Sequence, residues 1–364
     1  MAGWLNRATH GLPPLVILGT LVIGAIGGFA GYRAGLPLGM LMGSMLAVTF
    51  ASGAGLKIRG HALAVPQKWR QFFIPVIGLA IGANFPADFV AQLLIWWPTI
   101  ALLFVFVPLA HGIGYQIYRR IGGLSPQTAY FAGMPGGFIE AMEMGEQHGA
   151  EMRMLIMLQL LRLILCIVII PIVFSILEGH AVGSASGLSL GGNARADLGL
   201  WDVLVLVAIG AAGWFIAKSL GFPAAVLSGP LLLSALVHAL GLTDTAPPAW
   251  LVPVVQWIMG TTLGLRLAGF NRGQVWSAAR LALLNVVTVL GLATLAAMVL
   301  TTPVDEPVSA IILALAPGGV TEMSLVALSL HVSTVFVTIH HLLRIVLAVL
   351  MARIGLRYVL PEGH

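Results

Sequence analysis

The segment Pro135-Gly136-Gly137, followed by Glu140, occurs twice and indicates an internal duplication: Pro317-Gly318-Gly319, followed by Glu322, repeats it 182 positions later. Other residues recur at the same offset, namely Gly78 with Gly260, Gly82 with Gly264 and Arg162 with Arg344. Gly43 and Gly229 match at the slightly longer offset of 186. Two homologous halves, each with a helix-breaking motif beside an acid, typically build one site where the two motifs meet.

The composition places the chain in a lipid bilayer. Hydrophobic residues make up 59% and charged residues 9% of the 364 positions, and the mean hydropathy is +1.00, whereas soluble domains carry roughly 25% charged residues. Most of the apolar runs reach the ~17 to 25 residues that a helix needs to cross the bilayer. We predict ten spans, at about residues 13–31, 36–53, 71–85, 89–117, 154–177, 201–219, 222–240, 251–265, 275–300 and 333–352.

The two PGG segments, at about 126–150 and 307–331, decide the topology. If both enter the membrane and return, the basic loop residues gather on one side, apart from Arg33 and Arg195, as the positive-inside rule requires. If both cross, several more arginines move outside. We therefore predict an all-α polytopic protein of two inverted repeats, each with about five transmembrane helices plus a re-entrant PGG hairpin. Broken full-length helices are the competing form.

The domain organisation follows from this topology. An N-terminal membrane repeat covers residues 1–177 and a C-terminal membrane repeat covers 201–364, joined by the Gly/Ser-rich linker 178–200. The multi-pass chain is predicted in the bacterial inner membrane with both termini cytoplasmic. The net charge of +5 is spread over short loops, which indicates orientation and not direct nucleic-acid binding. The single cysteine, Cys166, excludes an intrachain disulfide and a cysteine-ligated metal site.

The PGG motifs are expected to open the helix at membrane depth. Proline lacks a backbone donor and glycine permits unusual conformations, so carbonyl and amide groups lose their helical partners. Such groups can coordinate a cation or hold an anion, although a plain hairpin tip is the structural alternative. Glu140 and Glu322 are acids at this depth, where a carboxyl is paired, protonated or functional. We predict that they bind H⁺ or Na⁺ as the coupling ion, and no other cofactor is expected.

The second recurring charge is an arginine on the helix after each hairpin. Arg162 and Arg344 remain charged, and a guanidinium binds a carboxylate through two donors. Each arginine is therefore either a lock on the neighbouring glutamate or a receptor for a carboxylate of the solute. Three residues earlier, on the same helix face, stand Gln159 in one half and His341 in the other. This asymmetry suggests that the halves divide the work.

The paired sequences PGGFIEAMEMG with QLLR and PGGVTEMSLVA with HLLR resemble the bacterial AbrB family of duplicated membrane proteins, over almost the whole chain. Members carry the labels ammonia monooxygenase and membrane regulator of gene expression. The architecture is also similar to that of inverted-repeat secondary carriers for citrate-like acids and glutamate, which have a glycine-rich re-entrant segment in each half. The resemblance implies a family and a fold more readily than an activity.

We conclude from the sequence that the protein is an ion-coupled secondary transporter, and not an enzyme. A small, anionic solute would bind at a midplane site formed by the two PGG motifs, Glu140, Gln159, Arg162, Glu322, His341 and Arg344. A homo-oligomer is compatible with this assignment. The first alternative is a membrane-embedded sensor that regulates gene expression through a partner. The second is a copper-dependent monooxygenase, suggested by six methionines near the first PGG motif together with His148.

Overall fold

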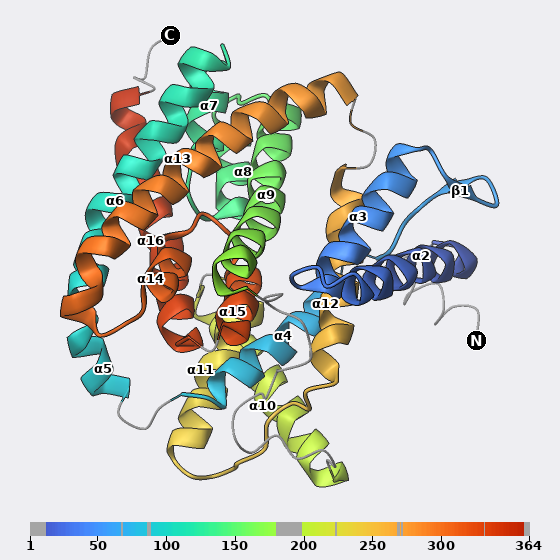
Figure 1. Cartoon of the computed structure of the whole chain (residues 1–364), viewed down its shortest axis with the longest axis vertical. Helices are drawn as coiled ribbons and strands as arrows, with labels where there is room; N and C mark the ends of the chain where they lie inside the picture. The colour runs from blue at the N-terminus through green and yellow to red at the C-terminus, as the bar shows by residue number, and fades with distance from the viewer. Residues whose placement is uncertain are drawn as a thin grey trace. The chain divides into compact units, whose positions relative to one another are not determined.

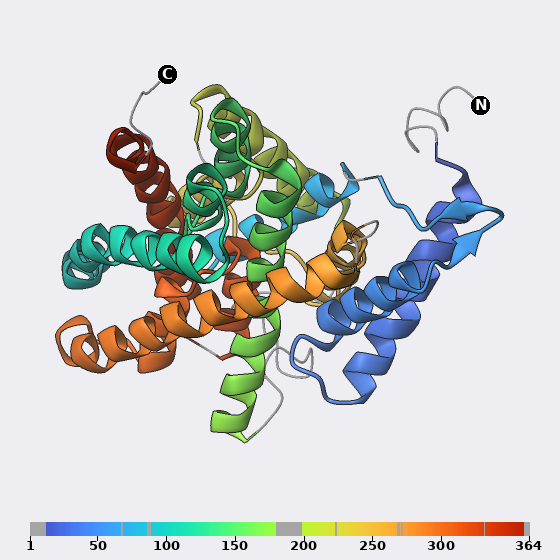
Figure 2. The ribbon, with the colours of Figure 1, turned by 90° about the horizontal axis from the view of Figure 1, so that it is seen from above.

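The computed structural model describes residues 12–66, 68–85, 89–179, 199–222, 224–267, 270, 272–330 and 332–359. Most of the predicted linker, including Arg195, and the first residues with Arg7 lie outside this part of the chain. The described residues are almost entirely helical (Figures 1 and 2). One short antiparallel pair, β1 (Lys57–Ile58) with β2 (His61–Ala62), is found among them.

Ten apolar helices match the ten predicted spans. Six are long and apolar enough to cross a membrane: α2 (Pro14–Arg33), α6 (Trp97–Gln116) with its π-helical extension η1 (Ile117–Ile121), α9 (Met152–Glu178), α10 (Leu200–Ser219), α13 (Arg272–Val304) and α16 (Thr334–Val359). Four are shorter: α3 (Gly39–Gly53), α4 (Trp69–Gly82), α11 (Ala225–Ala239) and α12 (Leu251–Gly264). The prediction of an all-α polytopic membrane protein is confirmed.

The remaining helices are short and lie between these ten. They are α5 (Phe89–Ile95), α7 (Pro126–Ala132), α8 (Phe138–Gln147), α14 (Val308–Leu315), α15 (Val320–Ser329) and the 3₁₀ turn η3 (Leu265–Leu267). α7 with α8, and α14 with α15, flank the two PGG motifs, so each motif interrupts helical structure as predicted.

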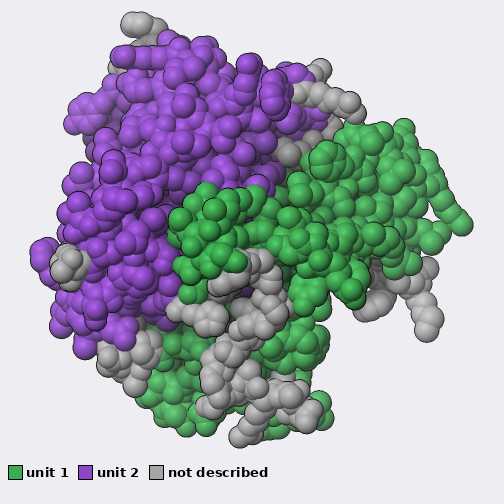
Figure 3. All heavy atoms as spheres, viewed as in Figure 1, with its two compact units in different colours: residues 1–87, 170–269, 328–330 green, residues 88–169, 270–327, 331–364 purple. Residues whose placement is uncertain are grey.

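The chain forms two compact units that cut across its two halves (Figure 3). Unit 1 comprises Met1–Ala87, Ile170–Gly269 and Leu328–Leu330, and thus holds the first three apolar helices of each half. Unit 2 comprises Asp88–Ile169, Phe270–Ala327 and His331–His364. It holds the tips and most of both PGG segments, the long helices α6, α13 and α16, and α9 up to Ile169. The halves 1–177 and 201–364 therefore describe the repeat in the sequence, and each compact unit contains parts of both.

Glycines let the helices of unit 1 approach closely. α2 and α3 lie side by side (Figures 1 and 2), and a Cβ at Gly43 of α3 would fall against the Gly27 carbonyl of α2. α10 and α11 repeat this contact, because a Cβ at Gly229 would fall against the Gly213 carbonyl. Gly229 and Gly213 lie 186 positions after Gly43 and Gly27, respectively. Residues that correspond in the two halves therefore make the same contact.

The third apolar helix of each half packs on the second apolar helix of the other half. A Cβ at Gly264 of α12 would lie 2.6 Å from the Met45 carbonyl oxygen of α3. The α4 glycine Gly78 stands in the same relation to the Leu227 carbonyl of α11, also at 2.6 Å. Glycines that recur in the two halves therefore let α4 and α12 approach their neighbours closely. That the two halves are inverted relative to each other stays a prediction.

The first PGG segment of unit 2 is a helical hairpin. α7 begins at Pro126 with Ser125 as its N-cap, whose Oγ accepts a hydrogen bond from the Thr128 amide at 3.3 Å. After α8 the chain returns to this same turn, because the Glu151 amide donates to Thr128 Oγ1 at 2.9 Å. The two ends of the segment therefore lie together, and Pro135 to Gly137 form its tip.

The second PGG segment also returns to its starting point. Trp96, before α6, hydrogen-bonds the Glu306 side chain just before α14. The same indole packs edge-on against Phe336 at the start of α16, with ring centroids 5.2 Å apart. Residues on both sides of the segment thus meet at one tryptophan. These contacts favour re-entrant hairpins over broken helices that cross the membrane.

Candidate functional site

The candidate site is built at the tips of the two hairpins. The first arm α7 ends at Ala132, and the second arm α8 begins after Gly137, which takes the left-handed conformation with φ of +70°. A side chain at that position would be strained, which explains a glycine there. The first arm therefore ends with carbonyls that no helical amide reaches, and the second arm begins at a helix N-terminus, whose backbone dipole favours negative charge.

Buried arginines bind the carbonyls at the end of each first arm. The Arg162 guanidinium donates to the Met134 carbonyl, and that of Arg344 donates to the Ala316 carbonyl. Both carbonyls belong to the residue directly before the proline of the motif. Arg344 makes a second bond, from Nη2 to the Gly318 carbonyl at 2.8 Å. Both side chains are almost fully buried, at 2% and 1% exposure.

The acids lie at the opposite side of each break. Glu140 and Glu322 stand in the first turn of α8 and α15, where a helix favours negative charge. The Glu140 carboxylate folds back, so that its Oε2 would lie 3.2 Å from a Cβ at Gly137. The Glu322 carboxylate folds against Gly319 in the same way and accepts a hydrogen bond from Thr321 Oγ1 at 2.7 Å. Glu322 is buried, whereas Glu140 is partly exposed.

This arrangement answers part of the question that the sequence left open. Each arginine faces the negative end of one half-helix, and each glutamate faces the positive end of the other. The Arg344 guanidinium donates to the Ala316 and Gly318 carbonyls and to His341, so it holds the backbone of the tip in place. A cation and an anion are thus held at each tip by backbone dipoles.

Gln159 and His341 occupy equivalent places beside the arginines, as predicted from their spacing. Gln159 Nε2 donates to the Phe131 carbonyl at 2.9 Å, and His341 Nε2 lies 2.8 Å from the Leu313 carbonyl. Each bond spans 28 residues, as do the two arginine bonds to the first arms. The first arm of each hairpin therefore runs alongside the helix that follows it in the same register.

The two arginines also act on each other within unit 2. Their charges interact, and both interact with the thiol of Cys166, one turn after Arg162. Tyr118 interacts with Arg162 and accepts a hydrogen bond from Asn285 Nδ2 at 3.1 Å. Neither Tyr118 nor Asn285 was predicted as a site residue from the sequence. Asn285 could have been selected, because it is an isolated amide inside an otherwise apolar span.

Several buried polar atoms near the arginines have no partner. In the described part of unit 2 they are Gln159 Oε1, Arg162 Nε, Asn285 Oδ1 and Arg344 Nε. Buried donors and acceptors are nearly always satisfied in proteins, so each such atom calls for an explanation. Three of the four belong to residues that the sequence predicted as binding residues. The set contains both donors and acceptors, as a polar ligand would require.

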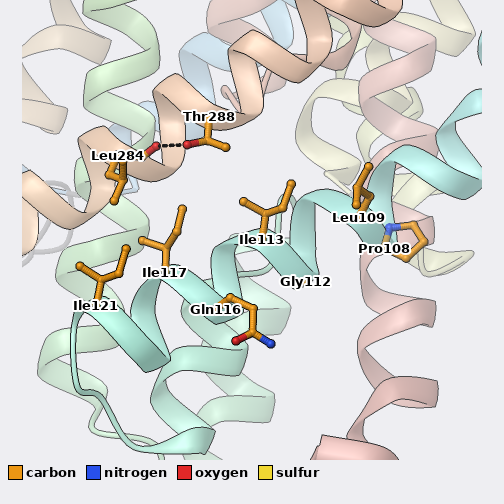
Figure 4. A pocket seen from close by; sticks show the side chains of 9 residues that line it. All are labelled: Pro108, Leu109, Gly112, Ile113, Gln116, Ile117, Ile121, Leu284 and Thr288. Carbon is orange, nitrogen blue, oxygen red and sulfur yellow. Dashed lines mark hydrogen bonds between the residues drawn. The ribbon is translucent and has the colours of Figure 1, made fainter.

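Two grooves among the described residues are lined mainly by apolar side chains. One lies between α6 and α13 in unit 2, with a volume of about 570 Å³ (Figure 4), and is lined by Pro108, Leu109, Gly112, Ile113, Gln116, Ile117, Ile121, Leu284 and Thr288. The Thr288 hydroxyl is bound to the Leu284 carbonyl at 2.7 Å. A second groove of about 560 Å³ lies between α4 and α10 in unit 1. Neither contains a predicted site residue, and neither offers charge to a polar solute.

A metal centre is not supported by the described side chains. Among them, no three His, Cys, Asp or Glu residues are grouped so that they could hold a metal ion. Of the methionines behind the copper alternative, Met134 and Met157 are fully buried in the apolar core. His148 is bound to the Met144 carbonyl at 2.7 Å on the surface of the first hairpin.

Glu306 gives unit 2 a pH-dependent stability at the base of the second hairpin. Burial raises the pKa of its carboxyl to about 7, the Trp96 hydrogen bond opposes this rise, and Asp305 adds to it. Because the folded pKa lies above the unfolded value of 4.5, stability is full below about pH 4.5, falls as the pH rises toward 7, and stays at the lower level above 7. We expect Glu306→Gln to remove this fall, of roughly 1 to 2 kcal/mol after discounting for partial exposure. Melting temperatures between pH 5 and 8 test this, and an unchanged profile in the variant would contradict it.

Comparison with known proteins gives a consistent result over most of the chain. A family model described as "AbrB: Transition state regulatory protein AbrB" matches residues 40–360. The chain is similar to "Uncharacterized protein YhjN" of Bacillus subtilis, with 24% identity over 90% of this chain and 89% of that protein. It is also similar to "Putative regulator AbrB" of Escherichia coli, with 23% identity over 80% of this chain and 81% of that protein.

Proposed function

The chain belongs to the AbrB family, and on the chemistry of its hairpin tips we propose that this member is an ion-coupled secondary transporter of a small anionic solute. One observation carries the proposal: two PGG hairpins in one compact unit each present a buried arginine, an acid and opened backbone. Interrupted helices at membrane depth are the usual binding element of secondary transporters.

The charge balance favours an anion as the solute. Arg162 and Arg344 repel each other, and their hydrogen bonds go to carbonyls, which neutralise a charge only in part. Burying a cation without a full counter-charge costs several kcal/mol. A carboxylate near the two guanidinium groups would supply the missing charge and accept from the unpartnered Nε atoms. We infer that the solute carries at least one carboxylate.

The glutamates have the complementary role in this proposal. Glu140 and Glu322 lie across the break from the arginines, on the second arms of the hairpins. A cation bound there would offset a carboxylate bound on the arginine side. This opposition of charges would couple the binding of solute to the binding of an ion. The coupling ion in the proposal is H⁺ or Na⁺, and the protein acts without another cofactor.

A regulatory function is the second candidate, and the name of the Escherichia coli relative favours it. The same hairpins would then bind a small ligand without moving it across the membrane. Binding and transport therefore need separate measurements. Neither function involves direct contact with nucleic acid in the proposed mechanism.

The decisive experiment combines binding and uptake on the purified full chain. A panel of small mono-, di- and tricarboxylates is screened for a rise in melting temperature, and those that bind are tested for uptake into proteoliposomes under an imposed H⁺ or Na⁺ gradient. We expect a bound acid to accumulate. Arg162→Lys and Arg344→Lys, which keep charge but lose the planar fork, should weaken its binding by about ten-fold or more.

A matched control separates local from general effects. Arg33 is exposed and packs over the Phe29 ring outside unit 2, so Arg33→Lys should leave binding and uptake unchanged. Binding without gradient-driven uptake would contradict transport and support the regulatory function. Full binding in both hairpin arginine variants would contradict the proposed site itself.

A further inference from the structure

The neighbouring histidines of α16, His340 and His341, are fully buried and have all four ring nitrogens in hydrogen bonds. The hydrogen-bond partners define which nitrogen carries a proton, because carbonyls only accept and guanidinium groups only donate. The two rings differ in this respect. The difference assigns them distinct responses to a proton.

His341 is held in its neutral form. Its Nε2 lies 2.8 Å from the Leu313 carbonyl and must donate to it. Its Nδ1 lies 3.1 Å from Arg344 Nη2 and must accept from it. A proton on Nδ1 would place one donor against another, and Arg344 Nη2 would lose an acceptor. That same Nη2 holds the Gly318 carbonyl at the hairpin tip.

His340 accepts either protonation state without moving. Its Nδ1 donates to the Phe336 carbonyl at 2.8 Å. Its Nε2 lies 2.9 Å from Thr99 Oγ1, which also lies 2.8 Å from the Trp96 carbonyl. When the ring is neutral, the Thr99 hydroxyl donates to Nε2. When the ring is protonated, Nε2 donates to the hydroxyl, which turns to the Trp96 carbonyl.

We propose that the coupling ion is the proton, and that, in addition to the two glutamates, the His340–His341 pair binds it and releases Arg344 from the tip of the second hairpin. The inference rests on the proposed transport function and names its ion. A proton bound at His341 Nδ1 favours a conformation in which Arg344 has left the Gly318 carbonyl. Solute affinity at Arg344 and proton affinity at His341 are therefore linked through one hydrogen bond.

Few other charged or titratable groups lie near His340 and His341. The charged and titratable groups acting on His341 are Arg344 and His340, both on α16. α14 offers the Leu313 carbonyl, and the segment at α6 offers the Thr99 hydroxyl and the Trp96 ring. These groups do not titrate. A proton that reaches this region meets the two imidazoles and, beyond Trp96, the Glu306 carboxyl, whose contribution is removed by repeating the comparison below in the Glu306→Gln variant.

The first half of the chain provides a built-in comparison. Leu158 and Gln159 stand where His340 and His341 stand in the second half, 182 positions earlier. Gln159 makes the equivalent bond to its first arm, from Nε2 to the Phe131 carbonyl. An amide can donate and accept as a neutral imidazole does, but it cannot take up a proton. Only the second hairpin would thus be proton-sensitive.

The test is hydrogen–deuterium exchange of the intact protein in lipid nanodiscs at about pH 5 and about pH 8, with labelling times scaled for the intrinsic rates. Residues 316–322 of the wild type should exchange roughly ten-fold faster at the acid pH, after scaling, because a hydrogen bond of the tip is lost. His341→Gln should abolish this difference. His61→Gln, at an exposed histidine in β2, should retain it.

The His341→Gln variant could lose the acid response simply by misfolding, so a second variant is designed to gain an acid response. Gln159→His places a titratable ring at the equivalent position and should make residues 134–140 exchange faster at acid pH. A full acid response in His341→Gln, or none in the wild type, would overturn the inference. If uptake of a bound acid persists without an acid response, the proton site alone is wrong. If the response is found without uptake, the proton site stands and transport is wrong.

Discussion

Arg344→Ala is expected to destabilise the protein by about 3 to 5 kcal/mol in the absence of solute. The substitution leaves the buried Ala316 and Gly318 carbonyls without their donors, and each orphaned group costs about 1 to 3 kcal/mol. The loss of a large, fully buried side chain adds a cavity. Relief from burying a charge returns part of this loss. Unfolding in lipid nanodiscs, followed by tryptophan fluorescence, measures the difference.

Two further variants show which interactions of Arg344 account for the loss of stability. Because Arg344 binds carbonyls and His341, adding Glu322→Gln should not restore the stability lost in Arg344→Ala. Recovery of most of the loss in the double variant would instead indicate that the pair acts as an ionic lock. Arg162→Ala should cost less, because Arg162 makes one of these carbonyl bonds where Arg344 makes two.

Gly43→Ala is expected to cost roughly 3 kcal/mol, the upper end of the usual range for overpacking. A Cβ there would fall against the Gly27 backbone carbonyl, and a backbone cannot move aside as a flexible side chain can. α2 and α3 would have to separate along their whole contact. The same measurement of unfolding in nanodiscs applies.

Gly53, in the same helix, provides the matched control. A Cβ at Gly53 meets nothing within 4 Å, so Gly53→Ala should change stability by no more than about 0.5 kcal/mol. Because alanine favours a helix more than glycine does, similar losses in both variants would mean that a general effect on expression or membrane insertion, and not close packing, sets the outcome. Gly229→Ala should repeat the result of Gly43→Ala in the second half of the chain.

The class of fold could be predicted because it depends on composition and on the length of apolar runs. All ten predicted spans correspond to helices, and Gly78 and Gly260, which recur at the repeat offset, both lie at close helix contacts. The partition into two units could not be predicted. It depends on which helices pack together over long distances in the sequence, and hydropathy carries no information on pairing.

The candidate site could likewise be predicted only in part from the sequence. The PGG motifs, the acids and the arginines could be selected because each is an exception within an apolar chain. What the arginines bind was left open, since carboxylate and carbonyl oxygens are equally suitable acceptors for a guanidinium. Tyr118 and Asn285 were missed because they have no counterparts at the repeat offset, and repetition was the main guide to function.

The exchange of contacts between the halves also bears on how such a chain could arise. α12 of the second half rests on α3 of the first, and α4 of the first half rests on α11 of the second. A single ancestral half would have exposed these glycine faces to lipid unless a second copy covered them. The unduplicated ancestor would therefore have worked as a pair of identical chains. Gene fusion would then have joined partners that already depended on each other, and a substitution on one of these faces would need a fitting residue on the other copy.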